Sequence, residues 1–145
     1  MKKLYVDSCI FISYLSNEMN TSKNYKGDRY HTFFELFYNH KFKLVISTWV
    51  IIEVKRYFKY KNQDFLDTMF ENMIQEFKDF GNLIILRFDE EDKRKARQLD
   101  SSNYPDALHV ILALKYNCSI LTTENIADFR KYKDVIEVLH PLDLI

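Results

Sequence analysis

The sequence predicts an α/β fold with three layers, α/β/α, and a mainly parallel central sheet. Short apolar runs of strand type alternate along the chain with longer segments of helical periodicity. The apolar residues within those short runs are continuous rather than alternating, which is typical of strands covered on both faces. The chain has 145 residues, of which 47% are hydrophobic, two are Gly and two are Pro. This composition favours long regular elements around one core, and we expect a single domain over residues 1–145.

Five short apolar runs are the expected strands. The second run is rich in branched residues, as strands commonly are. Pro141 stops the last run, because proline cannot donate a hydrogen bond to a sheet. In chain order the runs cover residues 2–7, 43–46, 83–86, 118–122 and 135–139.

Helices are expected between these runs. Apolar side chains repeat every three or four residues over 64–80, which is the spacing of one helix face. Ser47 or Thr48 can cap the helix after the second strand. The acids at 89–92 suit the first turn of a charged helix, and Pro105 suits the first turn of a buried one. The expected helices cover 9–15, 28–40, 49–60, 64–80, 89–101, 105–114 and 126–132, with a loop at 16–26.

Acidic residues follow several of the expected strands. In a parallel sheet covered by helices, ligands bind beyond the carboxyl ends of the strands. Each of these acids has apolar neighbours, where an unpaired charge would be costly and a bound cation would remove the cost. A hard divalent cation takes several oxygen ligands at one place. The sequence therefore predicts a metal site formed by Asp7, Glu53, Asp106 and Asp128.

Taken singly, each acid has an ordinary structural explanation. Asp7 can cap a helix, and Asp106 can be a first-turn acid that the helix dipole favours. Glu53 can pair with Arg56 at helical spacing, and Asp128 can pair with a basic neighbour. Four independent caps or pairs have no reason to fall at one edge of a sheet. Together, therefore, the acids favour the metal site over the separate explanations.

Four short segments around these acids form an ordered pattern that covers nearly the whole chain. They are Leu-Tyr-Val-Asp-Ser at 4–8, Ile-Ser-Thr at 46–48 leading to Glu53, Pro-Asp-Ala-Leu-His at 105–109, and Thr-Glu-Asn-Ile-Ala-Asp-Phe at 123–129. In this order and at this chain length, the pattern resembles the PIN-domain ribonucleases, especially the VapC-type toxins of prokaryotic toxin–antitoxin pairs.

This resemblance implies a PIN-like fold and a metal-dependent endoribonuclease. It implies that Asp7, Asp106 and Asp128 hold Mg²⁺ or Mn²⁺, with Glu53 acting directly or through water. The ion would lower the pKa of a bound water and offset charge that develops on the phosphoryl oxygens of RNA.

The resemblance also implies polar residues that orient the metal ligands or waters. These are Ser8, Thr123 and Asn125. Glu124 is an alternative to Asp128 as the fourth acid. We favour Asp128, because Asn125 and Phe129 align with the family's Thr-x-Asn-x-x-Asp-Phe pattern.

An acidic pocket would repel the RNA backbone, so other side chains must hold the phosphates. Basic residues after Glu53 and in the helix at 89–101 are candidates, although they can equally form solvated helix faces. The candidates are Lys55, Arg56, Lys59 and Lys61, together with Lys93, Arg94, Lys95 and Arg97.

The resemblance further implies partners. A VapC-type toxin has a small antitoxin protein, and helices in the middle of the chain often form a homodimer in this family. Most of the aromatic side chains over 65–80 and 33–37 are expected in the core, and the remainder can form an interface. Two alternatives stay open: a non-toxin PIN nuclease that matures ribosomal or other RNA, and a catalytically silent PIN-like module that binds RNA or protein.

Composition limits which partners and which cellular location the sequence indicates. Lys plus Arg and Asp plus Glu each number 21, so no overall basic field indicates a nucleic-acid partner. We expect no membrane segment and a cytoplasmic location, since neither a signal peptide nor an apolar run of about 18 residues is visible.

Cys9 and Cys118 are expected to be reduced, buried thiols. His109 is expected to be partly buried with a role in helix packing, and no Cys/His spacing for zinc exists.

Overall fold

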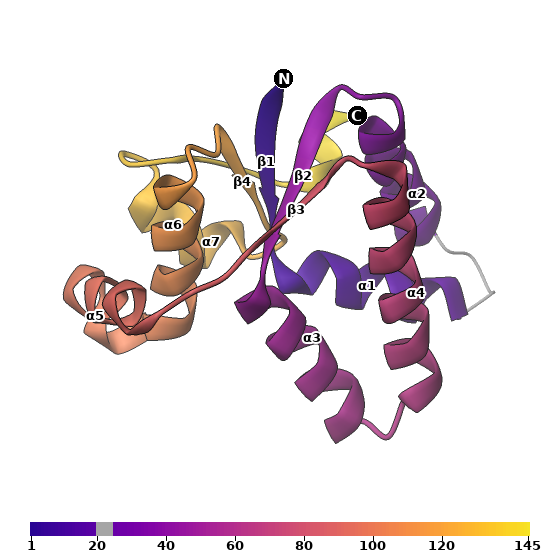
Figure 1. Cartoon of the computed structure of the whole chain (residues 1–145), viewed down its shortest axis with the longest axis horizontal. Helices are drawn as coiled ribbons and strands as arrows, with labels where there is room; N and C mark the ends of the chain where they lie inside the picture. Colours follow the sequence, from indigo (N-terminus) through magenta and orange to yellow (C-terminus); the bar gives the residue numbers. More distant parts are fainter. Residues whose placement is uncertain (20–24) are drawn as a thin grey trace.

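The computed structural model describes the backbone of residues 1–19 and 25–145 and the side chains outside 17–28. Five parallel strands form its central sheet, in the order β3-β2-β1-β4-β5 (Figure 1). The strands are β1 (Lys2–Val6), β2 (Phe42–Ser47), β3 (Leu83–Leu86), β4 (Ile120–Thr122) and β5 (Glu137–Leu139). The α/β class and the parallel sheet predicted from the sequence are therefore confirmed.

Helices cover both faces of this sheet. In Figure 1, α5, α6 and α7 lie on one side of the sheet, and α1, α2 and α4 lie on the other. This arrangement gives the three layers α/β/α. The helices are α1 (Ser8–Met19), α2 (Tyr25–Tyr38), α3 (Thr48–Tyr60), α4 (Asp64–Phe80), α5 (Glu90–Leu99), α6 (Tyr104–Lys115) and α7 (Ile126–Phe129), with short 3₁₀ turns at Ser101–Asn103, Arg130–Tyr132 and Pro141–Leu144.

Local capping explains where several helices begin. Ser47 accepts a hydrogen bond from the Val50 backbone N–H at 3.1 Å and so caps α3. Asp89 and Asp92 form a reciprocal capping box at the start of α5, which satisfies backbone donors that a helix leaves unpaired. Pro105 lies in the first turn of α6, where its missing N–H costs nothing.

Some element boundaries differ from those expected. The loop predicted over 16–26 is shorter, because α1 continues to Met19 and α2 already begins at Tyr25. Residues 16–19 contain neither Gly nor Pro, so their polarity alone does not end the helix. The last two strands begin two residues later than predicted, and the segment 126–132 divides into α7 and a 3₁₀ turn.

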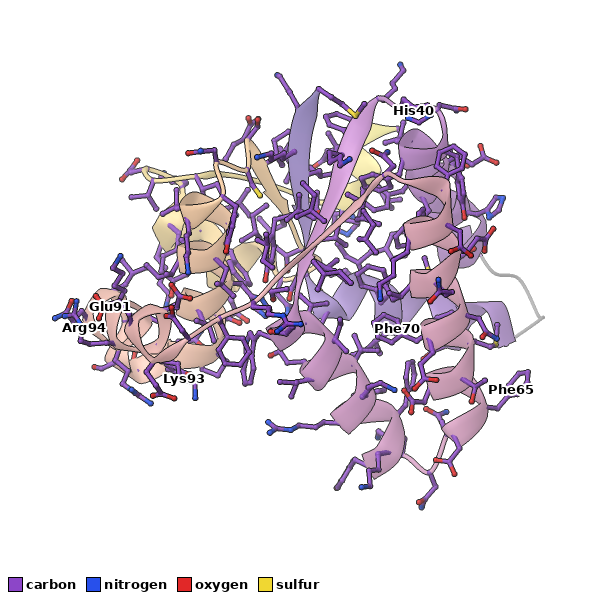
Figure 2. All side chains as sticks on the ribbon, in the orientation of Figure 1. His40, Phe65, Phe70, Glu91, Lys93 and Arg94 are labelled. Carbon is purple, nitrogen blue, oxygen red and sulfur yellow. The ribbon has the colours of Figure 1, made fainter. Side chains whose placement is uncertain are left out.

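The core between α1, α2, α4 and the sheet is rich in aromatic rings. Phe34 lies 5.4 Å from Phe11 and 6.0 Å from Phe77 between ring centroids. The side chain of Phe70 is buried and points inward from α4, whereas Phe65 is 62% exposed and points away from the core (Figure 2). The aromatic stripe is thus mainly core, with a remainder on the surface. No helix of the described residues is long and apolar enough to span a membrane.

The order of the strands places a crevice at one edge of the sheet. From β1 the chain moves to β2 on one side, and later to β4 on the other. Such a reversal leaves a crevice beyond the carboxyl ends of the two strands that flank it, which is where ligands bind in open α/β sheets.

Candidate metal centre

Asp7 lies at this crevice, directly after β1. Its backbone N–H donates to the Thr122 carbonyl at 3.0 Å, which joins it to the end of β4. Its carboxylate accepts hydrogen bonds from the Ser8 backbone N–H at 2.8 Å and from Thr123 Oγ1 at 2.7 Å. Asp7 is only 4% exposed, so these donors hold both carboxylate oxygens in a fixed orientation within the protein.

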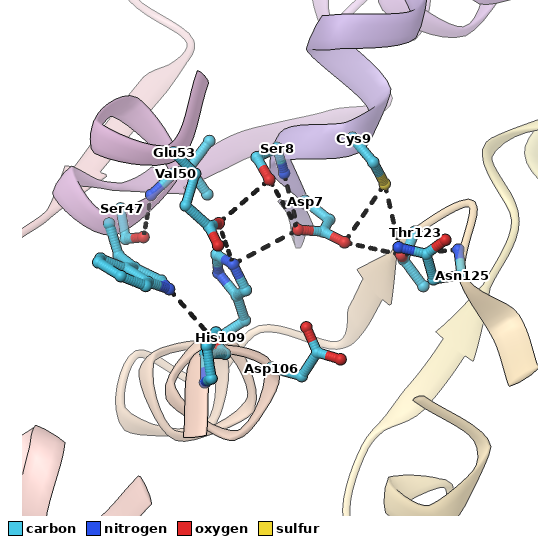
Figure 3. Close-up of polar contacts among 12 residues, drawn as sticks. Asp7, Ser8, Cys9, Ser47, Val50, Glu53, Asp106, His109, Thr123 and Asn125 are labelled. Carbon is cyan, nitrogen blue, oxygen red and sulfur yellow. Dashed lines mark hydrogen bonds and ion pairs between the residues drawn. The ribbon is translucent and has the colours of Figure 1, made fainter. Parts of the chain in front are cut away.

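Glu53 approaches the same place from α3. Its Oε1 atom accepts hydrogen bonds from Ser8 Oγ at 3.1 Å and from His109 Nε2 at 2.6 Å. Ser8 therefore contacts both acids, because its hydroxyl also lies 3.4 Å from Asp7 Oδ1. The helix that Ser47 caps thus carries the second carboxylate to the end of β1 (Figure 3).

His109 completes this cluster. The imidazole comes from α6 and is 1% exposed, with Nε2 3.4 Å from Asp7 Oδ1. One ligand atom each from Asp7, Glu53 and His109 lies within 4.8 Å of the other two, among the residues that the structure describes. On the other ring edge, Nδ1 lies 2.7 Å from the hydroxyl of Tyr5, which in turn lies 2.7 Å from Ser47 Oγ.

The expectation that His109 has a simple packing role is wrong. The ring is buried as expected, but both nitrogens have polar partners, and one of them faces two acids. The spacing of Asp106 and His109, three apart on one helix face, was the available signal. What the sequence did not show is that Tyr5, on the central strand, fixes the ring from the opposite side.

The electrostatics of His109 follow from its neighbours. Burial alone would lower its pKa, but the carboxylates of Glu53 and Asp7 outweigh burial and raise the pKa above its ordinary value. The buried imidazole therefore favours its protonated form and donates to Glu53. It balances part of the negative charge that the two carboxylates concentrate.

Asp106 lies in the first turns of α6, next to this cluster. Its carboxylate accepts a hydrogen bond from Asn103 Nδ2 at 2.7 Å, and Figure 3 shows it between His109 and Thr123. Burial raises the pKa of Asp106, and the charges of Asp7 and Asp128 raise it further. A carboxyl group that resists ionisation beside other acids would ionise more readily next to a bound cation.

Glu124 and Asp128, the two candidates for the fourth acid, lie in different surroundings. Glu124 accepts hydrogen bonds from Ser13 and Tyr30, so its carboxylate is held by α1 and α2. Asp128 is exposed on α7 and is close enough to influence the pKa of Asp106. Asp128 therefore remains the better candidate, although it lies outside the cluster of Asp7, Glu53 and His109.

Two of the three predicted orienting residues contact Asp7 with their side chains, namely Ser8 and Thr123. Asn125 is exposed and reaches the site through its backbone N–H, which donates to Thr123 Oγ1 at 3.0 Å. Cys9, which was expected to be a buried thiol, is only partly buried and donates from Sγ to Asp7 Oδ2 at 3.3 Å. Burial and the charge of Asp7 raise the pKa of this thiol. Cys118 is buried as expected.

The predicted phosphate-binding cations are in different situations. Lys55 forms ion pairs with Asp67 and Glu71, so it connects α3 to α4. Arg94 pairs with Glu91 within α5. Arg56 lies over the ring of Trp49, with 5.9 Å between its guanidinium carbon and the ring centroid. Lys93 is partly buried and pairs with Glu90. The other candidates, Lys59, Lys61, Lys95 and Arg97, are exposed.

The residues present fit a hard divalent cation. Two carboxylates converge, a third lies beside them, and oxygen atoms make up most of the available donors. Mg²⁺ and Mn²⁺ prefer such ligands and retain several waters, so a few carboxylates suffice. His109 Nε2 is engaged by Glu53, which leaves the carboxylate oxygens as the main candidates for ligands.

Comparisons with known proteins support the fold. No protein-family model matches the sequence, and no curated protein sequence matches it. Among solved structures, VapBC2 from Rickettsia felis bound to a DNA fragment from its promoter has a TM-score of 0.66 at 17% identity, covering 94% of this chain and 97% of that chain.

Two further structures give similar values. FitAcB from Neisseria gonorrhoeae has a TM-score of 0.63 at 15% identity, covering 95% of this chain and 97% of that chain. A toxin–antitoxin complex from Klebsiella pneumoniae has a TM-score of 0.57 at 16% identity, covering 97% of this chain and 98% of that chain. The chain therefore has the fold found in VapBC toxin–antitoxin structures, and the resemblance to VapC-type PIN domains is confirmed at the level of the fold.

Proposed function

We propose that this protein is a Mg²⁺- or Mn²⁺-dependent endoribonuclease and the toxin of a toxin–antitoxin pair. The observation that carries the proposal is the convergence of Asp7, Glu53 and His109 at the carboxyl edge of the sheet, with Asp106 beside them. The fold supports it, since structures with this fold are toxin–antitoxin complexes.

Each acid has a stated part in the proposed site. Asp7, Glu53 and Asp106 would hold the cation, and Asp128 would add negative charge from α7. The bound ion would lower the pKa of a water molecule and offset the charge that develops on the scissile phosphate. Ser8 and Thr123 hold the carboxylate of Asp7, while His109 holds that of Glu53.

His109 acts in this proposal as a positioning residue. Its N–H donates to Glu53, and Tyr5 fixes the opposite nitrogen, so the carboxylate has one defined orientation. Residues that orient metal ligands in this way commonly contribute as much as tenfold to a hundredfold to metal affinity. Because the imidazole is buried, it acts through Glu53 rather than through contact with RNA.

Partners follow from the toxin assignment. The antitoxin would be a small protein that covers the nuclease, and a groove of about 260 Å³ between α1 and α4 is one candidate surface for it. Its lining is partly apolar and includes Leu15, Met69 and Met73.

We also propose a homodimer in which exposed aromatic side chains near the turn between α3 and α4 are covered, among them Tyr60 and Phe65.

A cleavage assay tests the nuclease directly. Structured RNA is incubated with the protein in Mg²⁺, in Mn²⁺ and in EDTA, and the fragments are separated on a gel. Cleavage is expected with either metal and not in EDTA. Asp7→Asn and Asp106→Asn should abolish it and leave the far-ultraviolet circular dichroism unchanged, because removing a carboxylate from an acidic cluster relieves repulsion.

A matched control is Asp79→Asn, an exposed acid on α4 remote from the crevice. It should cleave at the parent's rate. Equal cleavage by Asp7→Asn and by the parent would contradict the assigned site. RNA binding without cleavage under any metal would instead favour the catalytically silent module.

A cellular assay tests the toxin role separately. Expression of the parent should arrest growth, and Asp7→Asn should restore it. Metal-dependent cleavage in vitro without growth arrest would favour the non-toxin PIN nuclease that matures RNA.

A further inference from the structure

Three aromatic side chains lie together beside the metal centre and take no part in it. Trp49 comes from the first turn of α3, Phe88 from the connection between β3 and α5, and Tyr104 from the start of α6. The ring of Trp49 lies 5.8 Å from that of Phe88 and 6.4 Å from that of Tyr104. All three side chains are partly exposed. We call these three residues the aromatic platform.

Each ring of the platform has a cation over it. The guanidinium carbon of Arg56 lies 5.9 Å from the Trp49 centroid, and that of Arg97 lies 5.0 Å from the Tyr104 centroid. Lys93 Nζ lies 5.5 Å from the Phe88 centroid. Cations at such distances are attracted by the ring quadrupole, so charge and aromatic surface are concentrated at one place.

The two arginines are available to a ligand. Among the side chains that the structure describes, 1–16 and 29–145, neither Arg56 nor Arg97 forms an ion pair with a carboxylate. Lys93 differs, because it pairs with Glu90 at 3.1 Å. In Figure 2, Lys93 lies on the side of α5 nearer to α3, whereas Glu91 and Arg94 lie at the far side. Two cations of α5, Lys93 and Arg97, therefore lie at the platform, whereas Arg94 pairs with Glu91 away from it.

The platform adjoins the metal centre directly. The ring of Trp49 lies 6.4 Å from the ring of His109, and its Nε1–H donates to the Pro105 carbonyl at 3.3 Å. Pro105 immediately precedes Asp106. Trp49 and Glu53 are four residues apart on α3, and residues at this spacing lie on the same helix face. An RNA chain that passes over Trp49 therefore also passes beside the acids of the metal centre.

We propose that the aromatic platform, with Arg56 and Arg97, binds unpaired bases and phosphates of single-stranded RNA next to the scissile phosphate. The proposal rests on the proposed nuclease function and deepens it, because it names the part of the substrate that is recognised. Bases stack on aromatic side chains whatever their sequence, and arginine contacts phosphate while remaining stacked. Such a surface offsets the repulsion between the acidic centre and the RNA backbone.

RNA suits this surface better than an acidic protein segment does. A peptide rich in Asp and Glu would use the arginines alone and leave the exposed parts of the three rings without a flat partner. Unpaired bases can stack there, and base stacking on aromatic residues contributes substantially to single-strand binding. Aromatic surface next to guanidinium groups that have no carboxylate partner among the described side chains therefore indicates a nucleic acid.

Trp49 is the only tryptophan in the chain, so its fluorescence reports the platform. The intact protein is titrated in EDTA with an unstructured single-stranded RNA of about a dozen nucleotides, a length that spans one binding groove. Saturable quenching is expected. A 5′-labelled copy of the same RNA gives affinities for the variants by fluorescence anisotropy.

Variants that remove a positive charge test the arginines, and a variant that removes a ring tests stacking. Arg56→Gln and Arg97→Gln should each raise the Kd for RNA, and each should lower the salt dependence of log Kd by about 0.7, as expected for one phosphate contact on a single strand. Tyr104→Leu should raise the Kd about fivefold or more through lost stacking. The matched control is Arg94→Gln on the same helix as Arg97, which should bind RNA as the parent does.

Three results would overturn the proposal: RNA binding that leaves Trp49 fluorescence unchanged, equal Kd values for Arg56→Gln and Arg94→Gln, or a Glu-rich peptide that binds as tightly as RNA. The last result would assign the surface to a protein partner. Because binding is measured in EDTA, failure of the platform is distinct from failure of the nuclease. Metal-dependent cleavage with normal binding by these variants rejects only the platform, whereas quenching without cleavage in Mg²⁺ or Mn²⁺ rejects only the nuclease.

Discussion

Asp7 is the residue around which the candidate site is built. Donors from Ser8, Cys9 and Thr123 reach its carboxylate, so both oxygens are oriented by neighbours in the chain or by the end of β4. Buried carboxylates of this kind require such partners, since an unpaired one would be strongly destabilising. The arrangement explains how an acid that is 4% exposed is accommodated beside Glu53.

The role of His109 gives a prediction at the same scale. His109→Ala removes the partner of Glu53 and one partner of the Tyr5 hydroxyl, and leaves both groups buried or half-buried. We expect the free energy of unfolding, measured in urea, to fall by about 1–3 kcal/mol. We also expect Mn²⁺ affinity, measured calorimetrically, to fall by about tenfold to a hundredfold.

His31→Ala is the matched control, since His31 lies on α2 with its side chain 62% exposed. Its free energy of unfolding should change by no more than about 0.5 kcal/mol. A His109→Ala protein with the parent's affinity for Mn²⁺ would contradict the positioning role.

The raised pKa of His109 predicts how stability depends on pH without metal. A histidine whose pKa is higher in the folded state contributes stability that is fully present below its unfolded value of 6.5 and is lost as the pH rises through the folded pKa. The Tm of the metal-free protein should therefore fall as the pH rises above about 6.5. In His109→Gln this fall of Tm with rising pH should disappear. An equal fall of Tm in the parent and in His109→Gln would show that another group is responsible.

At the residue scale, the sequence predicted part of the site. Asp7 and Glu53 could be found because each follows a strand and has apolar neighbours, and the structure brings them together. His109 could not be assigned from sequence, since its role depends on the register that places Tyr5 opposite the ring. The choice between Glu124 and Asp128 likewise depended on Ser13 and Tyr30, which hold Glu124 from two other helices.

At the scale of the helices, α3 and α4 form a connected pair. Lys55 on α3 forms ion pairs with Asp67 and Glu71 on α4. Sequence placed Lys55 among the residues that could bind RNA, because nothing in the sequence shows which helix lies beside it. Its ion pairs reduce the charge that it offers to phosphate, whereas Arg56, one residue later, lies over Trp49 and has no such pair among the described residues.

Helix α4 offers a matched pair for stability. Phe70→Ala removes a side chain that is 1% exposed and packs against Phe11, whereas Phe65 on the same helix is 62% exposed. We expect Phe70→Ala to lower the free energy of unfolding by about 3–5 kcal/mol through the lost burial and the cavity that remains. Phe65→Ala should change it by about 0.5 kcal/mol or less. Similar losses in urea unfolding for both variants would mean that α4 packs differently.

The extent of the helices was predictable where signals were strong. The bounds of α4 and β3 agree with the sequence, because a regular apolar repeat ends at Gly81, which adopts φ of +84° as a helix cap. The end of α1 was not predictable from polarity, since polar residues can occupy the solvent side of a helix as readily as a loop.

For the whole molecule, the continuous apolar strands were sufficient to predict a parallel sheet covered on both faces. The order of its strands was not predictable, although it is what brings Asp7 from β1 next to Thr123 from β4. The net charge of zero also does not show that acidic and basic side chains gather at different places on the molecule. Acids gather at the crevice, while Arg56 and Arg97 lie at the adjoining platform.

The proposed homodimer is a prediction for the whole molecule. Tyr60 is 83% exposed and Phe65 62% exposed at neighbouring ends of α3 and α4, and a dimer would cover such surface. Light scattering after gel filtration at micromolar concentration should give twice the chain mass of 17.6 kDa. Tyr60→Glu with Phe65→Glu should shift the protein to monomer. A parent protein that is strictly monomeric under these conditions would exclude the dimer.

The most direct test of the metal centre is a crystal of the protein soaked in Mn²⁺ and measured for anomalous scattering. The arrangement of Asp7, Glu53 and Asp106 predicts a strong anomalous peak at about 2.1–2.3 Å from carboxylate oxygens of at least two of these residues, a usual metal–oxygen distance. The same experiment on Asp7→Asn should give a weak peak or none. No peak at the crevice in the parent protein, or a peak only elsewhere, would contradict the metal centre and with it the nuclease.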